Sequence, residues 1–295
     1  MDARRIDPAV LRRRIRATLR SAREQAGMTQ RGVAREMDWS LSKLIRIESG
    51  IVNISTNDLR ALLRHYGVTE PARIDELVAM ARAARRPSDW DIYKDVVSSE
   101  FRTYLAHESA ATVIRGFESF AVPGLLQTAD YARAVMAGAA ISLEEDRLQK
   151  RLELRLDRQE LLLGSDGPKL FFIVDEAVIR RAVGGPGVMR EQLRHLLDLI
   201  HSEAATIYVV PFVAGFYPLL RWPTILLEFA DPDEPYLLYV ERPEGERLTR
   251  EDAHGSDVVG SPAAYLDAFF EAENLALDQS TTALIEQALG TLERP

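Results

Sequence analysis

The residues best suited to chemistry in this chain are polar and basic side chains between positions 29 and 50. Two short helices joined by a tight turn are predicted there, and the second presents its hydroxyl and basic groups from its first turns. Such a helix fits the major groove of DNA, where these groups reach base edges and phosphates. Side chains at the start of the first helix would contact phosphates and fix the register. The predicted DNA-binding residues are Gln30, Arg31, Ser40, Ser42, Lys43 and Arg46.

Hydroxyl side chains mark the beginning of both helices. Thr29 and Ser40 can each act as an N-cap, because a side-chain oxygen there accepts a hydrogen bond from a backbone N–H that has no partner within the helix. Apolar residues three or four apart give each helix one inward face. These inward-facing residues are Val33, Met37, Leu44 and Ile47. The sequence therefore predicts a helix-turn-helix whose polar groups point outward.

Flanking helices complete a first domain, which we place at residues 1–86. An amphipathic helix over about 11–27 precedes the two short helices. Ser55 begins a fourth helix and Thr69 a fifth, and Pro87 disfavours continuation of the fifth. The prediction is an all-α domain of five helices, with the helix-turn-helix at the second and third.

The net charge of −8 divides unequally along the chain. Residues 1–86 contain 18 Lys and Arg against 10 Asp and Glu, a net charge of +8. Residues 87–295 contain the other 19 Lys and Arg against 35 Asp and Glu, a net charge of −16. A basic N-terminal part on an acidic remainder is typical of a separate nucleic-acid-binding module. We therefore expect double-stranded DNA as a partner.

Residues 87–295 differ from the first domain in that both strands and helices are predicted. Helices are predicted over 186–201, about 261–275 and 281–292. The segment 113–122 is β-prone, and strands are predicted over 170–174, 206–212, 224–229 and 236–241. Because the pattern lacks regular βαβ alternation, we expect a larger α+β domain after the all-α domain.

Composition indicates where in the cell the protein is expected. Cysteine is absent, which excludes disulfides and cysteine-based zinc sites. No stretch approaches the roughly 18 uninterrupted apolar residues of a membrane span. We expect a cytoplasmic protein that does not associate with a membrane.

Other patterns do not predict catalysis, a cofactor or a bound metal. The five histidines form no H-E-x-x-H pattern, Gly184–Gly187 lacks a P-loop lysine, and no G-x-S-x-G occurs. The pair Asp175–Glu176 is typical of a solvated helix start. A set of aromatic residues is interpreted as part of the hydrophobic core, and the alternative is that these residues line a ligand pocket. Its members are Trp90, Tyr93, Phe212, Phe216, Tyr217 and Trp222.

The segment Asp38–Gly50 resembles Xre/Cro-type helix-turn-helix regulators, in the version of an actinobacterial subgroup. Later motifs are similar to the C-terminal domain of unknown function of that subgroup: Trp90–Tyr93, Val122–Thr128, Val183–Pro186 and Val210–Phe212. The resemblance implies a transcriptional regulator that is similar to the antitoxins of toxin–antitoxin systems. It also implies a small partner protein encoded nearby.

Two positions depart from the subgroup. Relatives usually carry Gly where Asp38 lies, but Asp tolerates the left-handed conformation, so the turn should survive. Relatives tend to carry Pro or Arg where Leu41 lies. Leu41 either contacts a thymine methyl group or packs on its own domain.

Two functions remain open from the sequence. The first is a sequence-specific DNA-binding regulator whose C-terminal domain forms a homodimer and receives a signal or a partner protein. In the second, the C-terminal domain is a small-molecule sensor or sequesters a partner, and DNA binding is mainly autoregulatory. A dimer is expected because one recognition helix reads too few base pairs to select a site.

Overall fold

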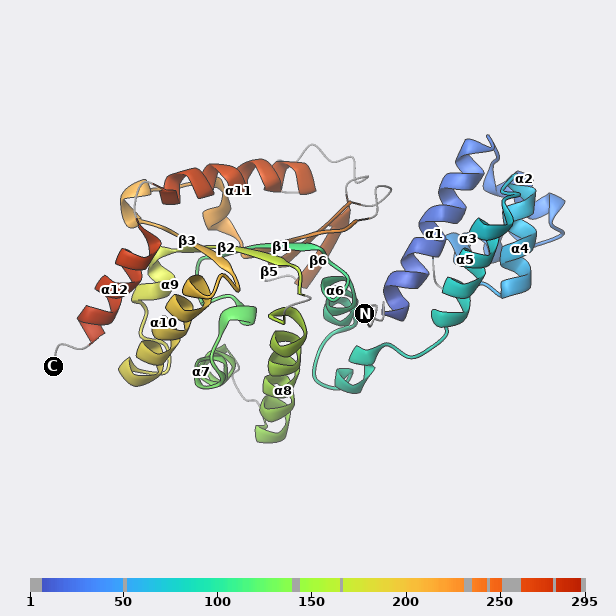
Figure 1. Cartoon of the computed structure of the whole chain (residues 1–295). Coiled ribbons are helices and arrows are strands. Elements are labelled where there is room, and N and C mark those ends of the chain that lie inside the picture. The colour runs from blue at the N-terminus through green and yellow to red at the C-terminus, as the bar shows by residue number, and fades with distance from the viewer. Residues whose placement is uncertain are drawn as a thin grey trace. The chain divides into compact units, whose positions relative to one another are not determined.

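The chain divides into two compact units, residues 1–92 with 105–110 and residues 93–104 with 111–295. Both are drawn in Figure 1. The computed structural model describes residues 7–49, 52–139, 144–164, 167–230, 235–242, 245–250, 261–277 and 280–292. The chain passes between the units three times: within the short 3-10 helix η1 (Asp89–Tyr93), within helix α6 (Ser99–Glu108), and shortly after α6.

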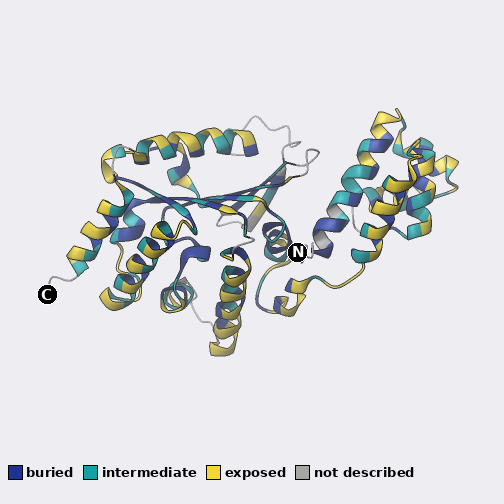
Figure 2. Ribbon diagram, in the orientation of Figure 1, coloured by how far each residue is buried: buried dark blue, intermediate teal, exposed yellow. Residues whose placement is uncertain are grey.

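The first unit is built from five α-helices around one core. They are α1 (Pro8–Gln25), α2 (Gln30–Glu36), α3 (Leu41–Ser49), α4 (Thr56–His65) and α5 (Pro71–Ala83). Each helix buries the apolar side of its amphipathic pattern, and the opposite side is exposed, as Figure 2 shows. The most deeply buried side chains are Leu19, Leu44, Leu59, Leu62 and Leu63. The predicted all-α domain with the helix-turn-helix at its second and third helices is confirmed.

Local signals explain most of the helix ends. Helix α1 ends in a Schellman turn at Gly27, whose φ is +68°, with Met28 N donating to Arg23 O at 3.0 Å. Ser55 caps α4 by accepting from Asp58 N at 3.0 Å. The predicted cap at Thr69 is wrong. Helix α5 begins at Pro71 without a side-chain cap. Proline has no backbone N–H that would require a partner, and its fixed φ suits the first helical position.

The second unit is built on a six-stranded mixed sheet in the order β3-β2-β1-β4-β5-β6. The strands are β1 (Val113–Glu118), β2 (Lys169–Asp175), β3 (Thr206–Val210), β4 (Thr224–Glu228), β5 (Tyr236–Arg242) and β6 (Gly245–Arg250). Strands β1, β2 and β3 pair in parallel, and the β1–β4, β4–β5 and β5–β6 pairs are antiparallel. The predicted α+β class is confirmed.

The parallel half of the sheet differs from the expectation of no βαβ alternation. Helices α7 (Ala129–Ala139) and α8 (Glu145–Leu162) connect β1 to β2, and α9 (Glu176–Arg180) and α10 (Pro186–His201) connect β2 to β3. These are two crossover units, each with two helices of unequal length. That inequality hides the alternation in the sequence.

Helices cover both faces of the sheet (Figure 1). Helix α11 (Pro262–Leu277) packs on one face over a core that includes Phe117, Leu238 and Val240. Helices α7, α8 and α10 lie on the opposite face, and α12 (Thr281–Leu292) contacts α9, α10 and β3. Because side chains alternate along a strand, Glu118 and Tyr239 belong to the face opposite α11.

Candidate nucleic-acid interface

Both helices of the helix-turn-helix begin at a hydroxyl cap. Thr29 Oγ1 accepts from Gly32 N at 3.1 Å, and Ser40 Oγ accepts from Lys43 N at 3.1 Å. Each bond satisfies one backbone N–H that the helix itself leaves without a partner. The two predicted caps are confirmed, and Ser40 is thereby held at the exposed start of α3.

The turn between α2 and α3 depends on one residue in the left-handed conformation. Asp38 has φ +54°, Asp38 N donates to Arg35 O at 3.2 Å, and Trp39 N donates to Ala34 O at 2.8 Å. This pair of bonds is the Schellman pattern that usually has Gly at the left-handed position. The expectation that Asp38 supports the turn is confirmed.

Helix α3 is divided into an inner and an outer face. Leu44 and Ile47 are buried, whereas Ser42, Ile45 and Arg46 are exposed. The outer face is where a groove would have to meet the helix. Leu41 is half-buried and packs against the core of the first unit, in agreement with the packing alternative at that position.

The six predicted DNA-binding residues fall into two groups. Arg31, Ser40, Ser42 and Arg46 are exposed, and Gln30 and Lys43 are half-buried. Both half-buried residues already have partners within the first unit.

Lys43 contacts two neighbours. Its Nζ lies 3.2 Å from Asp58 Oδ2 at the start of α4, and it lies 3.6 Å from the centre of the Trp39 ring. The pair is partly exposed, so solvent screens it and DNA phosphates can compete with Asp58 for the ammonium. Lys43 must exchange this carboxylate for DNA if it contacts the duplex.

A buried ion pair fixes α3 to α1. Arg23 Nε lies 2.8 Å from Glu48 Oε1, and Arg23 Nη2 lies 3.1 Å from Glu48 Oε2, a two-point contact in which both side chains are largely buried. Arg23 Nη1 also donates to Met28 O at 3.0 Å. The hydrogen bonds to Glu48 raise the pKa of Arg23. The pair holds the end of α3 while its first turns remain exposed.

Gln30 belongs to the same network. Its Nε2 donates to Glu48 Oε2 at 2.7 Å. Gln30 would have to break this hydrogen bond to make the predicted phosphate contact through Nε2. Sequence reasoning missed Arg23, Glu48 and Asp58, because these polar residues acquire their roles only when distant helices meet. The available signal was Glu48 itself, which follows the buried Ile47 on a short helix.

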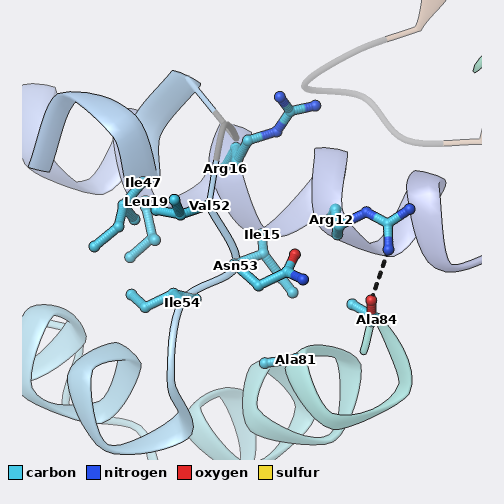
Figure 3. A pocket seen from close by; sticks show the side chains of 10 residues that line it. All are labelled: Arg12, Ile15, Arg16, Leu19, Ile47, Val52, Asn53, Ile54, Ala81 and Ala84. Carbon is cyan, nitrogen blue, oxygen red and sulfur yellow. Dashed lines mark hydrogen bonds between the residues drawn. The ribbon is translucent and has the colours of Figure 1, made fainter. Parts of the chain in front are cut away.

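A second feature of the first unit is a small pocket whose lining includes the buried Ile47 of α3. Figure 3 shows Arg12 and Ile15 of α1, Ile54 of the loop before α4, and Ala84 after α5 around it. Arg12 Nη1 donates to Ala84 O at 2.8 Å. The pocket holds about 20 Å³, which is room for about one water molecule, so it is not a ligand site.

The residues considered for other chemistry differ in burial. Among the aromatic set, Trp90, Tyr93 and Tyr217 are buried, Trp222 is half-buried, and Phe212 and Phe216 are exposed. The interpretation of this set as core is therefore wrong for Phe212 and Phe216. His254 lies outside the described residues. Within the described ranges, no group of three or more His, Cys, Asp or Glu side chains is arranged to hold a metal ion.

The acidic pair at the start of α9 differs from expectation. It lies at a helix start, but Asp175 and Glu176 are buried. Asp175 caps the helix through Ala177 N at 2.9 Å and accepts from Tyr217 Oη at 2.9 Å. Glu176 Oε2 accepts from Phe212 N at 2.8 Å. The pair connects α9 to the loop after β3, which sequence spacing could not reveal.

Comparison with known protein families assigns both units. Residues 14–77 match a helix-turn-helix domain, and residues 101–287, more than half of the chain, match a domain of unknown function, DUF5753. The chain belongs to the DUF5753 family. No curated protein and no solved structure matches it. In this member of the DUF5753 family, the helix-turn-helix match spans most of α1 through the middle of α5, and therefore includes all six predicted DNA-binding residues.

The helix-turn-helix match indicates a DNA-binding regulator. Such domains place their second helix in the major groove. Among the described residues, no helix has the length and apolar character needed to cross a membrane.

Proposed function

We propose that this DUF5753 protein is a sequence-specific DNA-binding transcriptional regulator that inserts α3 into the major groove. The observation that carries the proposal is the division of α3: its end is fixed by the Arg23–Glu48 pair, and its first turns expose Ser42 and Arg46. A rigid helix with exposed polar and basic groups is what base readout requires.

Each predicted residue has a role in this proposal. Arg31 and Gln30 contact phosphates from the start of α2, and Ser40 does so from the turn. Ser42, Lys43 and Arg46 face base edges. The existing bonds of Gln30 to Glu48 and of Lys43 to Asp58 oppose binding modestly, because each must be exchanged for a DNA contact.

The role of the acidic C-terminal domain is proposed more broadly. It forms the homodimer and receives a signal or a small partner protein, as the resemblance to Xre-type, antitoxin-like regulators implies. The alternative, a small-molecule sensor, is favoured by a cavity of about 370 Å³ in the second unit. Neither role requires catalysis, a cofactor or a membrane.

The proposal is tested by selecting bound duplexes from random DNA with the full chain, and by mapping bound sites in the genome of the source cell. We expect one enriched, near-palindromic sequence. Many genomic sites would indicate a broad regulator, and a single site beside its own gene would indicate autoregulation. Selection that enriches no sequence above the starting pool would contradict the proposal.

Fragments test the proposed boundary between residues 1–86 and 87–295. We expect the first fragment to bind DNA more weakly than the full chain, with an affinity that falls steeply as salt rises because bound cations are released from the phosphates. We expect the second fragment not to bind. Circular dichroism of each fragment confirms folding, and the reverse assignment of binding would contradict the boundary.

A further inference from the structure

A cavity of about 370 Å³ lies within the second unit, between α8 and the sheet face opposite α11. This volume is in the range of small-molecule sites. The side chains that give the cavity its chemistry are Phe101, Arg151, Arg155, Arg158, Tyr239 and Glu241.

Three arginines line the cavity from a single helix. Arg151, Arg155 and Arg158 are spaced by four and three residues, so they lie on one face of α8. Arg151 Nε donates to Val96 O at 2.9 Å, which anchors one edge of its guanidinium. An arginine side chain has five N–H donors, and this contact leaves the outer ones available for an anion.

Arg155 is held by contacts on two sides. Its Nη1 donates to Gln127 Oε1, and its Nε is buried without an acceptor among the described residues. A Cβ placed on Gly124 would lie 3.5 Å from Arg155 Nε, so the side chain passes closely over the backbone there. These contacts hold the guanidinium in place at the cavity wall, so an anion would meet it with little loss of side-chain freedom.

Acidic residues in the same wall do not cancel the arginines. Glu241 lines the cavity, and Glu118 lies at the end of β1 on the same sheet face. Burial, and then the charge of Glu241, raise the pKa of Glu118 to about 8, so it is mostly protonated at neutral pH. Burial lowers the pKa of Arg155 only to about 10, so it stays charged. The positive charge therefore exceeds the negative charge.

Aromatic rings form the apolar side of the cavity. The ring centres of Phe101 and Tyr239 are 6.2 Å apart, and Tyr104 packs against both, at 5.5 Å and 4.4 Å. The guanidinium carbon of Arg158 lies 5.5 Å from the Phe101 ring centre. A flat apolar group can pack on these rings while its charged group meets the arginines.

We propose that this cavity binds a small organic anion, a carboxylate or phosphate attached to an aromatic ring. The site would make the C-terminal domain a sensor, and in that respect the inference rests on the proposed regulatory function. Binding itself does not require DNA, so the two proposals can fail separately.

The test is titration calorimetry and thermal unfolding of the full chain with phenyl phosphate, benzoate, inorganic phosphate and neutral benzamide. We expect the two aryl anions to bind and to raise the melting temperature, and benzamide to do neither. Inorganic phosphate separates the contribution of the charged group from that of the ring. If it binds more weakly than phenyl phosphate, the ring contributes to affinity.

Arginine variants locate the site. Arg155→Gln and Arg151→Gln should each weaken aryl-anion binding by about tenfold or more, because each removes a charge-assisted hydrogen bond. Arg147→Gln is the matched control, since Arg147 lies on the same helix and donates to Asp95 O outside the cavity. Absence of binding by both aryl anions, or equal binding in all three variants, would overturn the inference, whatever the DNA-binding result.

Discussion

Lys43 is the residue whose two possible roles are easiest to separate. In the free protein it pairs with Asp58 and packs on Trp39, which would also suit a purely structural lysine that ties α3 to α4. Helical periodicity was sufficient to predict that Lys43, Ser42 and Arg46 lie away from the core. It could not predict the pairing with Asp58, because that contact joins residues brought together only by the tertiary fold.

Asp58→Asn separates the roles. If Lys43 contacts DNA, the variant should bind operator up to about fivefold more tightly, because an exposed ion pair of roughly 0.2–1 kcal/mol no longer competes. Fluorescence anisotropy measures this affinity. A denaturant melt measures the small loss of stability that follows from removing a negative charge near the start of α4. In the Lys43→Ala background the same change should have no such effect. Weaker binding by Asp58→Asn would assign Lys43 a structural role.

Glu118 gives a pH-dependent prediction. Burial and Glu241 raise its pKa from an ordinary 4.5 to about 8, Arg155 opposes the shift, and Tyr131 and Tyr265 are the other titratable groups that interact with it. Because the unfolded chain releases this proton first, the stability contributed by the protonated carboxyl is complete below about pH 4.5. It is lost progressively as the pH rises to about 8.

The glutamine in Glu118→Gln cannot release a proton, so this variant should not lose stability as the pH rises. The free energy of unfolding of the variant, relative to the unaltered protein, should increase by on the order of 1–3 kcal/mol between pH 5 and pH 8 and then level off. Urea melts across this pH range measure the difference. Glu160→Gln, an exposed change on α8, is the control. Parallel pH profiles for Glu118→Gln and the unaltered protein would contradict the prediction.

At the scale of elements, local chemistry determined what was predictable. The caps at Thr29, Ser40 and Ser55 and the helix at 186–201 follow from nearby residues, and the structure confirms them. Strand β6 was missed because half of the residues in Gly245–Arg250 are charged and its order comes from pairing with β5. The parallel order of β1, β2 and β3 was missed because strand pairing is a long-range property.

The turn at Asp38 provides the test at this scale. A non-glycine residue in the left-handed region costs roughly 1–2 kcal/mol, less for Asp than for most residues. Asp38→Gly should therefore raise the free energy of unfolding by about 0.5–1 kcal/mol, and the β-branched Asp38→Val should lower it. Arg35→Gly, inside α2, is the matched control and should cost about 1 kcal/mol. Denaturant melts measure all three, and a destabilised Asp38→Gly variant would show that its side chain has another role.

At the scale of the whole molecule, the charge division and the two units agree with a DNA-binding part joined to an acidic part. The sequence predicted this division, but not the cavity in the second unit, because α6, α8 and β5 must fold together to form it. We expect a dimer through the second unit, since two basic N-terminal parts repel each other.

Exposed apolar side chains after β3 identify the surface to test. Phe212, Val213 and Phe216 are 58%, 81% and 69% exposed. We expect the full chain to sediment as a dimer at tens of micromolar, and Phe212→Ser with Phe216→Ser to shift it towards monomer by about tenfold or more in Kd. Phe120→Ser, at a residue 61% exposed, is the control. A full chain that is monomeric and binds one half-site would contradict the dimer.

The central claim, that α3 reads DNA, is tested most directly by operator affinity at one fixed salt concentration. Fluorescence anisotropy would compare the full chain with Lys43→Ala, Arg46→Ala and Arg82→Ala, the last an equal loss of charge at an exposed site on α5. If α3 reads DNA, each α3 variant should lose about 1–3 kcal/mol of binding free energy where its contact is to a base. Arg82→Ala should lose much less. Unchanged affinity in a folded Lys43→Ala/Arg46→Ala double variant would show that α3 does not read DNA.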